Sequence, residues 1–85
     1  MKLNPNISKA METVIPAAQL VSEVIDSPED YTKQEALGAM ESLEIAVEES
    51  SHCHKVSMVD LDEALELQHN FTLNTARQSI EGAEY

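Results

Sequence analysis

This chain is poor in the residues that make turns and cross-links. It has two glycines, three prolines, one cysteine and no tryptophan among 85 residues, and 4% of the chain is aromatic. So few turn residues argue against an all-β fold, which needs them at intervals of roughly 8–12 positions. The single cysteine, Cys53, cannot form an intramolecular disulfide, so we expect packing alone to stabilise the fold in a reducing compartment.

Long apolar runs are missing as well. No stretch approaches the roughly 18 apolar residues of a membrane-spanning helix, and the N-terminal residues lack the apolar segment of a secretion signal. We therefore expect a cytoplasmic protein of bacterial or viral origin. Its 85 residues predict a single helical domain over residues 1–85, too small for a core plus a deep substrate cavity.

Basic residues are the third scarcity. Five lysines and arginines stand against 16 acidic residues, which gives a formal net charge of -11. Residues 23–66 hold 13 of the acids and two lysines, so this segment carries the whole net charge. Such a surface argues against binding nucleic acid or anionic membranes and favours a basic protein partner. No catalytic or cofactor motif is present, which predicts a non-enzymatic protein without a cofactor.

What the chain has in quantity is helix-forming aliphatic residues, within an apolar content of 42%. In residues 6–26 they recur at alternating steps of four and three, a seam that predicts a first helix and comprises Ile7, Met11, Val14, Ala18, Val21 and Ile25. Asn4 is a candidate N-cap before Pro5. Pro16 removes one helical hydrogen bond, so we expect a kink there or two shorter helices.

A second helix is predicted to begin at Ser27 and Pro28 and to run to about residue 51. Its core stripe comprises Ala36, Ala39, Met40, Leu43, Ala46 and Val47. Gly38 lies inside this helix, where it costs stability and is expected to allow a close approach of another helix. Residues 51–55 form the connecting loop.

Ser57 caps a third helix, which buries Leu61, Ala64 and Leu65. We expect this helix to continue to Gly82, although poor helix formers at residues 69–74 leave open a break and a short fourth helix that carries Ala76, Ser79 and Ile80. Because the connections are short, neighbouring helices must pair, so the predicted fold is an all-α, antiparallel three-helix bundle.

One face of the second helix carries a row of acids. Glu41, Glu44, Ile45 and Glu48 share this face at spacings of i, i+3, i+4 and i+7. Like charges repel there, and an exposed isoleucine gains nothing in a monomer. We predict a contact surface in which Ile45 is the apolar anchor and the glutamates meet lysine or arginine of a partner. A plain solvated face is the alternative.

The third helix offers an extension of this surface. Asp62, Glu63 and Glu66, beside Val59, join it if the two helices are adjacent. Carboxylates one helical turn apart are spaced on the order of the phosphates of a nucleic-acid strand. The predicted partner is therefore a basic, DNA- or RNA-handling protein that this chain inhibits or regulates as a nucleic-acid mimic, as small acidic phage and mobile-element proteins do.

Three alternatives remain open. Residues 37–44, with Gly38, Ala39, Ser42 and Leu43, resemble the Gly-Ala-Asp-Ser-Leu region of acyl carrier proteins, although Glu41 replaces the aspartate and Met40 is an extra residue. That resemblance implies a phosphopantetheine arm on Ser42 and docking charges at Glu44, Glu48 and Glu49. A structural homodimer would use the seam of the first helix. A metal site would draw on His52, Cys53, His54 and His69, but adjacent residues rarely point to one metal, so a polar loop is the preferred interpretation.

Overall fold

The structure is a computed structural model that describes residues 5–83. Within these residues it has four α-helices, namely α1 (Pro5–Asp26), α2 (Lys33–His54), α3 (Met58–His69) and α4 (Leu73–Gly82), and a short 3₁₀ helix, η1 (Pro28–Asp30). The all-helical prediction is confirmed. The three-helix bundle is not, because a fourth helix follows α3. The candidate cap Asn4 lies outside the described residues.

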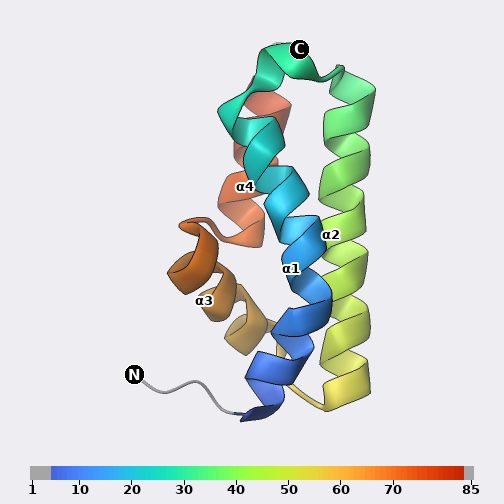
Figure 1. The fold of residues 1–85 in the computed structure, drawn as a ribbon, viewed down its shortest axis with the longest axis vertical. Coiled ribbons are helices and arrows are strands. Elements are labelled where there is room, and N and C mark those ends of the chain that lie inside the picture. The colour runs from blue at the N-terminus through green and yellow to red at the C-terminus, as the bar shows by residue number, and fades with distance from the viewer. Residues whose placement is uncertain (1–4, 84–85) are drawn as a thin grey trace.

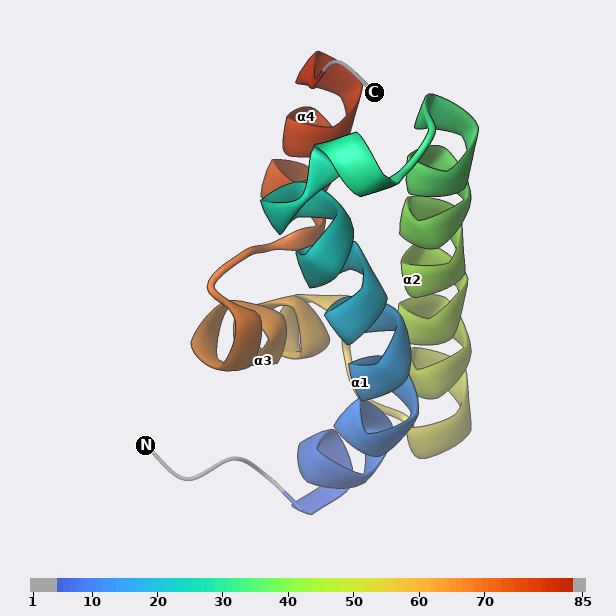
Figure 2. The same cartoon turned by 45° about the horizontal axis from the view of Figure 1, so that its top comes forward.

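The two long helices form the body of the molecule. α1 and α2 lie antiparallel and side by side over most of their length (Figure 1). α3 crosses on the other side of α1, and α4 then runs back toward η1 and packs against both long helices (Figure 2). The resulting fold is a pair of long helices with two short helices covering one side of it.

The core lies where the four helices meet. The predicted stripes are largely confirmed, because all of their central members are buried, while Ile7, Ile25 and Ala46 at the edges are partly buried and pack against the core. Its fully buried larger side chains are Met11, Val14, Val21, Val24, Met40, Leu43, Val47, Leu61, Leu65 and Ile80. The seam of α1 is therefore used inside the chain, and a dimer through it would have to open the core.

Pro16 lies within α1, which continues through it, so the alternative of two shorter helices is wrong. Both Pro16 and Glu12 are exposed, on the side of α1 away from the core. Because the carbonyl of Glu12 is the one that loses its helical partner, water can satisfy it there. The kink at Pro16 stays a prediction.

The start of α2 differs from the prediction. Ser27 makes no side-chain capping bond, and Pro28 opens only η1. The helix begins after Thr32, whose hydroxyl accepts a hydrogen bond from the backbone N–H of Glu35 at 3.1 Å, while the Glu35 carboxylate accepts one from the Thr32 N–H at 2.9 Å. This reciprocal capping box satisfies two donors, whereas Ser27 satisfies none, which explains the later start.

The other end of α2 also differs, since the helix runs through the expected loop to His54. It stops at Lys55, which adopts the left-handed conformation with φ of 53°. Gly38 lies on the exposed side, where an added Cβ would meet nothing within 4 Å. The expected close helix approach at this glycine is therefore absent.

The chain breaks between α3 and α4 at Asn70, so the expected continuation to Gly82 is wrong and the alternative of a fourth helix is confirmed. Asn70 is left-handed with φ of 62°, a conformation that asparagine tolerates better than most residues. Thr72 then caps α4, accepting from the Thr75 N–H at 3.2 Å. As for membranes, none of the helices within residues 5–83 is both long and apolar enough to cross a bilayer.

Candidate functional site

The exposed face of α2 presents three of the predicted contact residues. Glu41, Ile45 and Glu48 all point away from the core stripe, and Ile45 retains 47% of its exposure. Across residues 5–83, neither glutamate carboxylate has a hydrogen bond or an ion pair. The structure therefore shows an apolar side chain between two carboxylates on a helix that is capped at its start and packed along its other face.

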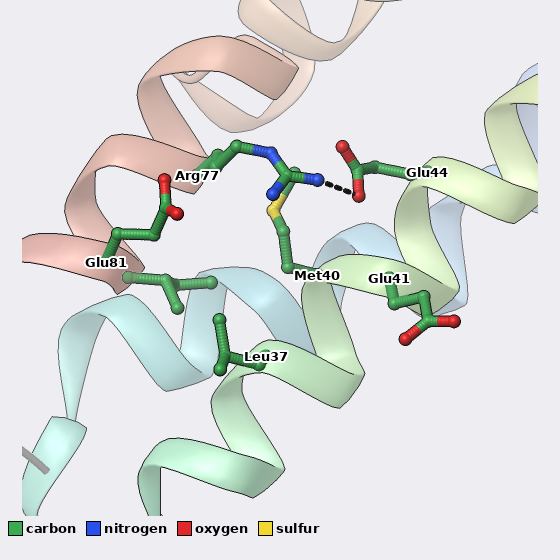
Figure 3. A pocket seen from close by; sticks show the side chains of 7 residues that line it. Leu37, Met40, Glu41, Glu44, Arg77 and Glu81 are labelled. Atoms are coloured by element: carbon green, nitrogen blue, oxygen red, sulfur yellow. Dashed lines mark hydrogen bonds and ion pairs between the residues drawn. The ribbon is translucent and has the colours of Figure 1, made fainter.

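Glu44 is different, because its carboxylate is paired inside the molecule. It lies at the edge of α2 nearest α4 and forms a hydrogen-bonded ion pair with Arg77 (Figure 3). This hydrogen bond, and then the negative charge of Glu44, raise the pKa of Arg77. One acid of the predicted row thus has its charge offset by α4.

A groove opens between α2 and α4 next to this pair. It has a volume of about 290 Å³ and is lined by Leu37, Met40, Glu41, Glu44, Arg77, Ile80 and Glu81. Met40 and Ile80 are buried, while Leu37 keeps 42% of its exposure. In Figure 3 the carboxylate of Glu41 points away from Arg77, whereas Arg77 extends from α4 toward α2. The groove therefore has an apolar base and a mainly acidic rim.

The acids of α3 do not continue the α2 surface. Both views place α1 between α3 and α2 (Figures 1 and 2), and the two helices meet only near their connection. Glu63 and Glu66 are exposed on α3 beside Val59, which keeps 68% of its exposure. Asp62 is half-buried, and its carboxylate accepts a hydrogen bond from the backbone N–H of Leu73 at 2.7 Å. Asp62 thus holds the first turn of α4.

Sequence reasoning missed the contacts that dock α4. Asp62 binds the N-terminus of α4. At the C-terminus of α4, Lys33 donates from Nζ to the carbonyl oxygens of Ile80 and Glu81, both at 2.9 Å. A negative group at the start of a helix and a positive group at its end both complement the helix dipole. No local signal could have found these contacts, because Lys33 is 47 and 48 residues from its acceptors.

The remaining candidates are placed as follows. His52 and Cys53 are exposed and His54 is half-buried in the last turn of α2. The described part of the chain brings no three His, Cys, Asp or Glu side chains together as a metal site would require. His69 is half-buried next to Phe71, with ring centroids 5.9 Å apart. Ser42 is exposed well inside α2, whereas the carrier-protein resemblance requires a serine at the start of a helix.

These geometries leave the exposed face of α2 and the adjoining groove as the surfaces with binding chemistry. Comparisons of the chain with known protein families, with curated proteins and with solved structures found no match.

Proposed function

We propose that this chain is a non-enzymatic interaction protein that binds a basic protein through the exposed face of α2. The observation that carries the proposal is Ile45, which is 47% exposed between the carboxylates of Glu41 and Glu48. Both acids lack an internal partner within residues 5–83. An unpaired acid, an apolar anchor and a second unpaired acid match a surface on which lysine or arginine flanks an apolar residue.

The physical setting favours such an interface. α2 is fixed by a capping box and by its packing on α1, so binding costs little conformational entropy on this side. The net charge of -11 attracts a basic partner over long distances and speeds its association at low salt. Binding should therefore weaken steeply as ionic strength rises.

The partner class follows from the charge. Proteins that handle DNA or RNA carry basic grooves, because they must neutralise phosphates. An acidic helix of this kind would occupy such a groove and thereby inhibit or regulate its owner. The α2 face would then act as a nucleic-acid mimic, with Ile45 adding an apolar contact that nucleic acid does not make in the same place.

The test uses two charge reversals, Glu41→Lys together with Glu48→Lys. Glu44 is left unchanged, because a lysine at this position would face Arg77 and disturb the docking of α4. The matched control reverses Glu12 and Glu29, which are exposed on α1 and η1 and give the same net charge. Immobilised wild type and variants are compared for the basic proteins that each captures from a host extract, quantified by mass spectrometry.

We expect a basic protein that is captured by the wild type and by the Glu12/Glu29 control, and lost with Glu41→Lys/Glu48→Lys. Circular dichroism should show unchanged helicity in all three proteins. Equal loss in the control would mean that only total charge matters, and equal capture by all three would remove the α2 face as the binding site.

A further inference from the structure

The groove between α2 and α4 is continuous with the α2 face. Leu37, Glu41 and Ile45 follow one another at intervals of four residues, so they form one exposed stripe along α2. Leu37 and Glu41 also line the groove, together with the base formed by Met40 and Ile80. A partner seated on Ile45 and Glu41 would therefore reach the groove directly.

The rim of the groove carries acids that form no ion pair within the described residues. Three glutamates line it, and only Glu44 has an ion pair within the described residues, with Arg77. The carboxylates of Glu41 and Glu81 are exposed and have no ion pair in residues 5–83. The groove thus combines an apolar base with two carboxylates that form no ion pair within the described residues, of which Glu81 also lies within the electrostatic reach of Arg77.

Arg77 shows which side chain suits these surroundings. Its aliphatic stem extends across the groove beside Met40, and its guanidinium reaches Glu44 (Figure 3). Arginine can cover apolar surface with its stem while its planar head binds carboxylates, whereas the compact, strongly hydrated lysine ammonium lacks this planar geometry. A second arginine, from a partner, would find an apolar base and one carboxylate on each wall of the groove, Glu81 on α4 and Glu41 on α2.

We propose that the groove receives an arginine side chain of the basic partner, between Glu41 and Glu81 and over Met40 and Ile80. Arg77 is then a built-in competitor, because its positive charge opposes an incoming guanidinium and occupies one of the three carboxylates. This inference rests on the proposed function of the α2 face. It adds the identity of the basic side chain and a residue that limits its affinity.

The test uses deca-arginine peptide as the probe and follows the protein by NMR. In the wild type, the methyl signals of Met40, Ile80 and Leu37 should shift together with the signals of Ile45 as the peptide is added. Deca-lysine peptide has the same charge and should shift the groove signals less and bind more weakly. Equal groove shifts and equal affinity for the two peptides would overturn the arginine assignment.

The competitor role is tested with Arg77→Gln, for which Lys9→Gln is the matched control. Lys9 is exposed on α1, so its replacement changes the net charge equally at a distance from the groove. Removing a surface ion pair that competes for one carboxylate should tighten deca-arginine binding about two- to fivefold beyond the effect of Lys9→Gln. Equal dissociation constants for the two variants would overturn the role of Arg77.

The outcomes separate this inference from the proposed function. Shifts at Ile45 with silent methyl groups at Met40 and Ile80 would reject the groove and leave the α2 face standing. Capture of the host partner by Glu41→Lys/Glu48→Lys would reject the α2 face, whatever the peptide does. Because the methyl shifts are measured on the wild type, the result does not depend on whether Arg77→Gln keeps α4 in place.

Discussion

The α1–α2 pair and α4 are held in the fold by different shares of apolar and polar contacts. α1 and α2 are 22 residues each and pack along continuous apolar stripes. α4 has 10 residues, of which only Ala76 and Ile80 are buried. An isolated helix of this length is unstable in water, so its position depends on contacts from other helices. Apolar contacts come from Ala76, Ile80 and the partly buried Leu73 in the core, and polar contacts come from Asp62, Lys33 and Glu44.

The difference teaches that the charged residues of this chain have two uses. Glu44 and Asp62 belong to the acidic segment that suggests a partner surface, yet both hold α4. The carboxylates of Glu41 and Glu48 bind no other helix within the described residues. Charge alone therefore does not identify the binding surface. An acid is available to a partner only where the fold leaves it unpaired.

The largest expected loss of stability comes from a truncation in the α1–α2 pair. Leu43 is completely buried in α2, so Leu43→Ala should lower the free energy of unfolding by about 2–5 kcal/mol. A domain of this size has only about 4–13 kcal/mol in total, so the loss is a large part of it. Urea denaturation followed by circular dichroism measures the change over all helices at once.

The same truncation on α4 sharpens the comparison. Ile80→Ala should release α4 locally, so that hydrogen exchange quickens at α4 amides while α1 amides stay protected. If the two variants instead unfold the whole chain alike, α4 is as integral to the core as α2 and the distinction between the two regions fails.

The next effect concerns the N-terminus of α4. Asp62→Ala removes the acceptor of the Leu73 N–H and the negative charge at the positive end of the helix dipole, so we expect a loss of about 1–2 kcal/mol. Hydrogen exchange of the α4 amides and urea denaturation both measure it. Glu63→Ala is the matched control, because Glu63 is exposed on the same helix and its side chain has no hydrogen bond or ion pair in residues 5–83. A change as large in the control would mean that net charge, and not this hydrogen bond, is responsible.

The comparison also explains how far the sequence could predict the structure. The stripes of α1 and α2 follow from a local periodicity, so the sequence could predict their buried residues and the exposure of Ile45. The start of α2 was missed because Ser27 and Thr32 both suit a cap, and only the reciprocal bond with Glu35 decides between them. The break at Asn70 was missed because a single left-handed residue leaves a weak signal.

The site was predictable to the same limited degree. Helical spacing alone places Glu41, Ile45 and Glu48 on the outer face of α2. It cannot show that Glu44 meets Arg77, since the partners are 33 residues apart, nor that Asp62 reaches Leu73 across the turn. The groove depends on the position of α4, so no pattern within α2 could indicate it.

A smaller effect, of opposite sign, is expected on the α2 side. Gly38→Ala should raise the free energy of unfolding by about 0.5–1 kcal/mol, because alanine has the higher helix propensity and its methyl group meets nothing within 4 Å. Urea denaturation measures this gain, and the α2 contact surface should keep its affinity for the deca-arginine peptide. A loss of stability would show that another helix or a partner copy approaches this position.

The smallest expected effect is the ion pair between α2 and α4, because both side chains are partly exposed and water and salt screen their attraction. A double-mutant cycle with Glu44→Gln and Arg77→Gln isolates it from the loss of each charge alone. The coupling should be favourable at low salt, fall below the gain from Gly38→Ala, and vanish in concentrated salt, while the effect of Asp62→Ala persists because that hydrogen bond is half-buried. A coupling that survives high salt would mean that this pair, and not the two ends of the helix, fixes α4 against α2.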